Sequence, residues 1–265
     1  MKKNILSMVI GATLFLTSNA FSSEANLVQT YIELANKGNV NAQHNLGVMY
    51  SYGKGVKQDY QVARQWFTMA AEQGEVDSQH SLAVMYYEGL GVKQDYKTAS
   101  QWFLKAAEQG HADSQGTLGV MLANGMGVKQ DLQAAKRWFM AAAKQGNAGG
   151  QYNLGVMYDV GIGVEQDYQT ALQLYLKAAE QGDAKAQFNL GIMYDEGKVG
   201  QDYQAARQWY LKAAEQGDAG AENNLGLIYF KGKGVRRNLV VARFYFRKAC
   251  DKGFYEGCHN YRAFN

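Results

Sequence analysis

Cys250 and Cys258 are the residues of this chain with the clearest capacity for chemistry, and they lie eight positions apart. A cysteine pair can form a disulfide, bind a metal or react as a thiol. One segment, Ser51-Tyr52-Gly53-Lys54, matches the S-x-x-K spacing of a serine nucleophile and its lysine. No K-T-G or S-D-N follows it anywhere in the chain, so the spacing alone indicates a chance match.

His44 and His80 are the candidate metal ligands, because they are 36 residues apart in otherwise similar surroundings. A shared zinc ion would need both nitrogens about 2 Å from the metal, whereas neighbouring helices pack about 8–10 Å apart. No cysteine or third histidine recurs in the same register. The G-x-G loops are not preceded by strands, so they do not predict phosphate binding. We therefore expect no metal and no cofactor.

A period of 36 residues organises the elements that must position these side chains. Asn45-Leu46-Gly47-Val48-Met49-Tyr50 returns as Asn153 to Tyr158 and, with one change, as Asn189 to Tyr194. Glycines fall at 38, 74, 110, 146, 182, 217 and 253, with a spacing of 36 except for one of 35. The missing residue lies in a G-x-G-V loop that shortens to Gly197-Lys198-Val199, so both flanking helices should be intact.

Each period predicts two helices, here named A and B. Helix A of the first repeat is expected from Val40 to Tyr52, with Leu46, Gly47 and Tyr50 on its buried face. Glycine recurs at the Gly47 position although it costs about 1 kcal/mol in a helix, which indicates that another backbone approaches closely. Helix B should begin after the N-cap Asp59 and end at Gly74.

The recurring motifs A-x-x-N-L-G-x-M-Y, G-x-G-V, D-Y-x-x-A and W-F/Y-x-x-A-A-x-x-G resemble the Sel-one-like repeat, a relative of the tetratricopeptide repeat. The resemblance covers residues 24–265 and implies an all-α, right-handed α/α superhelix of about six helix-turn-helix repeats that contact only their neighbours. We expect repeats near 38–73, 74–109, 110–145, 146–181, 182–216 and 217–252, with capping helices at 24–36 and 253–265.

The repeat register gives the cysteines a meaning. Alanine occupies the Cys250 position in the other repeats, and glutamine or glutamate occupies that of Cys258. A joint change to cysteine at two contacting positions predicts a disulfide in an exported protein. The same C-x7-C spacing resembles the Helicobacter cysteine-rich proteins, a secreted branch of this family. That likeness implies, as the alternative function, a β-lactam-binding or weakly β-lactamase-like protein related to the cell wall.

One stripe of helix A changes its residues from repeat to repeat, and we call it the variable stripe. The family resemblance places the stripe in the concave groove of the superhelix. Varied side chains on a repeated scaffold are typical of protein or peptide recognition, and the carboxylates among them would form an acidic rim; the rival interpretation is an idle, solvated surface. The candidate groove residues are His44, Val48, Tyr52, His80, Tyr87, Glu88, Asn124, Tyr152, Asp159, Phe188, Asp195, Glu196, Asn223 and Phe230.

The first twenty residues have the pattern of a targeting segment. Lys2 and Lys3 precede the apolar run Ile5 to Leu16, and Ser18-Asn19-Ala20 offers small residues at a cleavage site. This pattern is typical of a secretory signal peptide over residues 1–20, and it is too short for a membrane span. We expect a mature chain in the periplasm or outside the cell, with no transmembrane segment.

Charge and composition limit the partners. The formal net charge is only +3, which argues against nucleic acid, and the absence of proline excludes collagen-like chains. Residues 231–262 nevertheless hold nine basic and two acidic residues. This basic end could meet an anionic surface or serve as a polar cap. The sequence thus predicts an exported, monomeric, non-enzymatic scaffold with a protein or peptide ligand. Besides the β-lactam-binding alternative, a third hypothesis is a structural protein that assembles with itself into rods.

Overall fold

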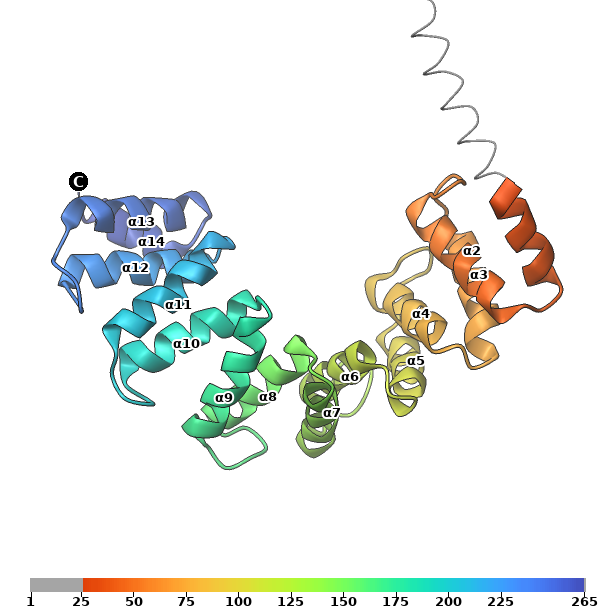
Figure 1. The fold of residues 1–265 in the computed structure, drawn as a ribbon, viewed down its shortest axis with the longest axis horizontal. Coiled ribbons are helices and arrows are strands. Elements are labelled where there is room, and N and C mark those ends of the chain that lie inside the picture. The colour runs from red at the N-terminus through yellow and green to blue at the C-terminus, as the bar shows by residue number, and fades with distance from the viewer. Residues whose placement is uncertain (1–25, 265) are drawn as a thin grey trace, which may run out of the picture. The chain divides into compact units, whose positions relative to one another are not determined.

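The computed structural model describes residues 26–264, and this part of the chain is helical without strands. The predicted signal peptide lies outside the described residues. A helix over residues 26–36 precedes the labelled elements. The A helices are α2 (Val40–Tyr52), α4 (Val76–Glu88), α6 (Ala112–Asn124), α8 (Ala148–Val160), α10 (Ala184–Glu196) and α12 (Ala219–Lys231), followed by the short α14 (Tyr255–Arg262) (Figure 1). The B helices are α3 (Tyr60–Glu72), α5 (Tyr96–Glu108), α7 (Leu132–Lys144), α9 (Tyr168–Glu180), α11 (Tyr203–Glu215) and α13 (Leu239–Asp251).

The chain forms two compact units that divide between Gln130 and Asp131. In the first unit, helices α2 to α5 pack in sequence, each against the next, and α6 packs on α5. The second unit repeats this arrangement from α7 to α14 (Figure 1). The expected all-α architecture of stacked helix pairs is confirmed within each unit.

The ends of the helices follow the predicted caps. The Asp59 carboxylate accepts hydrogen bonds from the amides of Gln61 and Val62, so the first turn of α3 has partners for two otherwise free donors. Gly74 ends this helix with a φ of 91°, a conformation that favours glycine. The deletion at the 197–199 loop leaves α10 and α11 at thirteen residues each, as expected.

The recurring glycine of helix A faces an aromatic ring and not a backbone in α2, α8, α10 and α12, which corrects the expectation. A Cβ atom on Gly47 would lie 2.5 Å from the ring of Phe67, and one on Gly191 would lie 2.4 Å from that of Tyr210. These rings belong to helix B of the same repeat and are almost completely buried. Because these glycines carry no side chain, helix A leaves room there for the flat ring of helix B, and the interior is closely packed.

Buried amide side chains join consecutive repeats. The Gln43 side chain donates to the carbonyl of Ala35 in the preceding helix at 3.1 Å and accepts from Gln73 at 2.6 Å. In the sixth repeat the equivalent pair is a glutamate and a lysine. Glu222 is fully buried, and its carboxylate lies 2.8 Å from the Lys252 ammonium. The glutamine pairs give their buried amides partners, and in the sixth repeat one carboxylate oxygen of Glu222 is paired while the other, Oε2, is buried without a hydrogen-bond partner.

Candidate functional site

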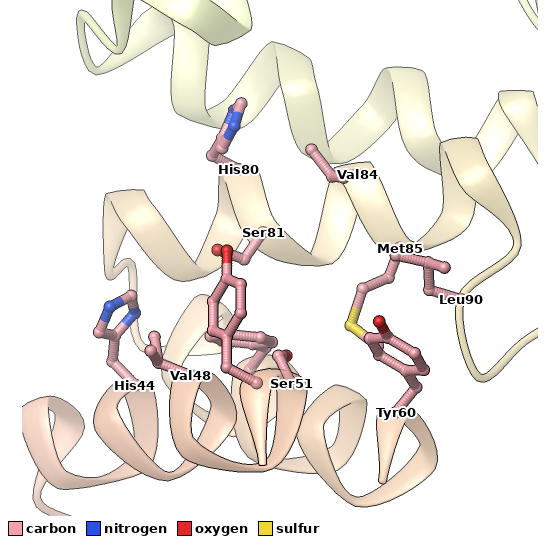
Figure 2. A pocket seen from close by; sticks show the side chains of 11 residues that line it. His44, Val48, Ser51, Tyr60, His80, Ser81, Val84, Met85 and Leu90 are labelled. Atoms are coloured by element: carbon pink, nitrogen blue, oxygen red, sulfur yellow. The ribbon is translucent and has the colours of Figure 1, made fainter. Parts of the chain in front are cut away.

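The variable stripe of the first unit lines a pocket of about 480 Å³ between the first two repeats. Helix α2 contributes His44, Val48 and Ser51, and α4 contributes Val84 (Figure 2). Tyr60, at the start of α3, packs with Met85 and Leu90 at one end of the pocket (Figure 2). The structure therefore brings stripe residues of α2 and α4 together around one concavity with a largely apolar lining.

Tyr52 is the most accessible aromatic residue at this pocket, with 72% of its surface exposed. The Lys54 ammonium lies 5.5 Å from the centre of its ring. Tyr87 is less free, because its ring makes edge-to-face contacts with Tyr96 and Phe103. Burial raises the pKa of the Tyr87 hydroxyl. The remaining candidates of this unit, Glu88 and Asn124, are exposed.

His44 connects α2 to the beginning of α4. Its Nδ1 lies 2.8 Å from the Ser78 hydroxyl and 3.2 Å from a carboxylate oxygen of Glu75. Burial raises the pKa of Glu75, but hydrogen bonds from Ser78 and the nearby His44 outweigh it and leave the pKa lowered. A catalytic triad uses opposite ring nitrogens for serine and acid, whereas both groups here meet Nδ1 and Ser78 is fully buried. This cluster therefore has a structural role: the Glu75 carboxylate caps the N-terminus of α4, and His44 contacts it from α2.

His80 repeats the connection one repeat later, with its Nδ1 2.8 Å from the Ser114 hydroxyl. Its ring stacks on His111 at 4.3 Å and meets Phe103 edge-on. Burial and the neighbouring His111 lower the pKa of His80 to about 4, although Asp113 and Asp77 act in the opposite direction. Over the described range, no group of three or more potential ligands is placed to hold a metal ion.

In the second unit the expected acidic rim is largely neutralised. Asp159 lies 3.0 Å from the Lys198 ammonium, and only 11% of its side chain is exposed. Asp195 forms the corresponding pair with Lys233 at 2.6 Å. Each lysine belongs to the loop of the following repeat, so these aspartates serve as repeat-to-repeat contacts. Glu196 remains the more exposed acid, 3.7 Å from Lys198.

The sequence contains a pattern that could have predicted these pairs. The loop position that holds Lys198 and Lys233 is leucine, methionine or isoleucine at Leu90, Met126 and Ile162. The aspartate position one repeat earlier is then serine, tyrosine or alanine. Aspartate and lysine therefore occur together, one repeat apart, as expected for residues in contact.

The aromatic members of the second unit are partly used for packing. Tyr152 lies 5.9 Å from the ring of Tyr175, and Phe188 lies 5.9 Å from that of Tyr210. Burial raises the pKa of Tyr152. Phe188 also covers Gly220 of the next repeat, where an added Cβ would lie 3.1 Å from its ring. Replacing these two residues would therefore change packing as well as surface.

The end of the stripe is covered by the last helix, which corrects the placement of Asn223. Asn223 is only 5% exposed, and its side chain accepts a hydrogen bond from Asn260 of α14 at 2.8 Å. Phe230 meets Phe264 edge-on at 5.7 Å. The reason is that α14 packs on α12 as the A helix of a further repeat would.

Comparison with known proteins decides the family. The Sel1 repeat model matches six times, at residues 40–75, 76–111, 112–147, 148–183, 184–218 and 219–254. The chain belongs to the Sel1 repeat family. None of the curated proteins matches it. In the part of this Sel1 repeat protein that the structure describes, no helix has the length and apolar character needed to span a membrane.

Solved structures agree with this family. The chain is 40% identical to c5321, a protective antigen present in uropathogenic Escherichia coli strains, with a TM-score of 0.82 over 91% of this chain. It spans about half of that protein, 52%. A Sel1 repeat protein from Oxalobacter formigenes is 34% identical, with a TM-score of 0.73, 85% of this chain and 99% of that one being covered. A putative Sel1 repeat protein from Klebsiella pneumoniae, 24% identical, with a TM-score of 0.51 over 76% of this chain and 98% of that one, shares the fold.

The cysteines of this Sel1 repeat protein form a disulfide, as the sequence predicted, with a Cα–Cα distance of 4.3 Å. Its position is the one that the glutamine-to-alanine hydrogen bond occupies elsewhere, because Gln43 and Ala35 are also eight residues apart. The disulfide thus links Cys258 of α14 to α13 at the positions where glutamine and alanine form a hydrogen bond in other repeats. The cystine and the S-x-x-K match, whose lysine lies over Tyr52, give no support to β-lactam chemistry.

Proposed function

We propose that this protein is an exported, non-enzymatic scaffold that binds a protein or peptide segment through the variable stripe of its A helices. Sel1 repeats generally mediate protein interactions, and the fold of this chain is that of the family. Export is supported by the signal-like residues 1–20 and by the disulfide, since disulfides persist in oxidising compartments. The relative c5321 is a protective antigen, which also fits exposure outside the cytoplasm.

The pocket between α2 and α4 is the observation that carries the proposal. It combines a volume of about 480 Å³ with an apolar lining and the largely exposed ring of Tyr52. Val48, Val84 and Leu90 can receive one or two apolar side chains of a ligand, and Ser51 and Ser81 offer hydroxyl groups. Exposed aromatic residues beside such a hollow are common interaction hot spots.

Crosslinking in intact cells followed by mass spectrometry would identify the partner, and titration of variants would then test the pocket. Tyr52→Ala should weaken binding by about 2 kcal/mol, roughly 30-fold, because it removes an exposed anchor. Ser81→Phe should weaken it by filling the pocket. Circular dichroism should show unchanged helix content in both variants.

Gln61→Ala is the matched control, since Gln61 is exposed on helix α3 outside this pocket. We expect it to bind as well as the original protein. Equal partner affinity in the original protein, Tyr52→Ala and Ser81→Phe would refute the pocket as the binding site.

A further inference from the structure

Two exposed positions of α13 hold apolar residues where the other B helices have polar ones. Val240 and Phe244 are one helical turn apart, and 81% and 56% of their surfaces are exposed. The Val240 position is polar in the five preceding repeats, as is that of Phe244. The residues are Gln61, Lys97, Gln133, Gln169 and Gln204 at the first position, and Gln65, Gln101, Arg137, Gln173 and Gln208 at the second. A polar cap would keep these polar residues, so the change calls for another explanation.

The basic residues of this region divide into two sets. Three lysines neutralise acids of the fifth and sixth repeats, because Lys233 pairs with Asp195 while Lys248 and Lys252 pair with the buried Glu222. The remaining basic residues are exposed at the surface of this end: Lys231, Arg236, Arg237, Arg243, Arg247 and Arg262. Five of these six are arginines, the side chain that binds phosphate through two parallel hydrogen bonds.

Arginines and apolar side chains meet in one shallow depression of about 370 Å³. It is lined by Val240, Arg243, Phe244, Arg247 and Tyr261, with the Arg243 guanidinium 5.3 Å from the Tyr261 ring. Arg247 is two-thirds exposed and lies 3.7 Å from the equally exposed Asp251, a weak surface pair. Two cationic groups thus lie beside apolar groups in one depression.

We propose that this face of α13 binds an anionic phospholipid surface. Val240 and Phe244 would enter the boundary between headgroups and acyl chains, and the arginines would contact the lipid phosphates. Apolar side chains that protrude from a helix suit a deformable lipid layer better than they suit a polyanion. The face lies on a B helix and is separate from the A-helix stripe of the proposed function.

Vesicle co-sedimentation of residues 21–265, which include every described residue, tests the proposal. Vesicles of phosphatidylcholine with about 30% phosphatidylglycerol should bind the protein at least about tenfold more tightly than phosphatidylcholine alone, with the difference shrinking as salt rises. Val240→Gln with Phe244→Gln should reduce that binding at least about tenfold. These changes install the fifth repeat's residues, so folding should be preserved. Arg236→Gln with Arg247→Gln should reduce it by about 30-fold.

Two controls make the result specific. Gln169→Val with Gln173→Phe places the same apolar pair on α9 without the arginine cluster and should not add binding to anionic vesicles. Tyr52→Ala should bind vesicles normally, which separates this surface from the pocket of the first unit. Equal vesicle binding by the Val240/Phe244 variant, or no preference for phosphatidylglycerol at low salt, would overturn the proposal. Binding of an acidic peptide that depends on Phe244, without vesicle binding, would overturn it in favour of a protein partner.

Discussion

At the scale of single residues, this chain changes its contacts in pairs. Asp159 is accompanied by Lys198, and the two positions that form a glutamine-to-alanine hydrogen bond elsewhere become Cys258 and Cys250 at the end. The two residues of each pair lie on different elements of the structure and contact each other. Substituting only one of them would leave the other polar group or thiol without its partner. The physical reason is that unpaired buried polar groups cost about 1–3 kcal/mol each.

His80 gives a prediction at this scale. Its pKa is lowered to about 4 in the folded protein, compared with an ordinary value of 6.5 for a histidine side chain. The unfolded chain therefore binds the proton more readily between these values, so stability is complete above about pH 6.5 and declines as the pH falls toward 4. We expect the thermal midpoint to fall over this range, as measured by circular dichroism.

The control for this prediction is a pair of glutamine variants. His80→Gln should flatten the pH dependence between pH 6.5 and 4, while His259→Gln, at an exposed position, should not. Asp95 and Asp167 also have lowered pKa values, through hydrogen bonds from their capped helices, and their contribution is lost only at still lower pH. An identical pH profile in the His80 variant would contradict the assignment.

At the scale of elements, helices A and B of a repeat pack through an aromatic ring of helix B that lies against a glycine of helix A. Gly191→Ala places a Cβ 2.4 Å from Tyr210, so the ring must shift. Overpacking of this kind costs about 1–3 kcal/mol, which exceeds the gain in helix propensity of about 1 kcal/mol. We expect a lower urea midpoint for this variant.

Gly149→Ala is the matched control for the glycine prediction. Gly149 also lies in an A helix, but an added Cβ would meet only a side-chain oxygen of Asn147 at 3.4 Å. This variant should keep or raise the urea midpoint, because only the propensity changes. If both variants moved the midpoint in the same direction, packing against the ring would not be the cause.

At the scale of the whole molecule, each helix contacts mainly its neighbours in sequence, so a local change should have a local effect. Cys250→Ala with Cys258→Ser removes the disulfide, worth about 2–3 kcal/mol for so short a loop in the chain-entropy description. We expect faster hydrogen exchange in α13 and α14. Helices α2 to α5 should exchange at the original rate.

Replacing the cystine by the family's own contact provides the comparison. Cys250→Ala with Cys258→Gln offers the hydrogen bond that Gln43 makes to Ala35, and it should recover part of the lost protection, about 1 kcal/mol. Exchange that rises equally in every helix would show that the described chain unfolds as one cooperative body and would refute the nearest-neighbour view.

The repeat, its helices and their caps could be predicted from the sequence because they depend on local rules. Asp59 at an N-cap, Gly74 after a helix and the 36-residue period act within a few residues, and the structure follows them. The family and the position of the disulfide followed from the same register. The variable stripe was identified as a set of positions by its changing residues.

Only the tertiary structure decided which stripe residues are free. Asp159 and Asp195 are paired with lysines of the next loop, Asn223 lies beneath α14, and Tyr52 remains exposed. Periodicity shows which face of a helix a residue occupies, but exposure and charge on that face depend on contacts with residues about 30 to 40 positions away. Contacts between helices also placed an aromatic ring, instead of a backbone, against the recurring glycine of α2, α8, α10 and α12. A local sequence pattern does not show which residues of other repeats lie nearby in space.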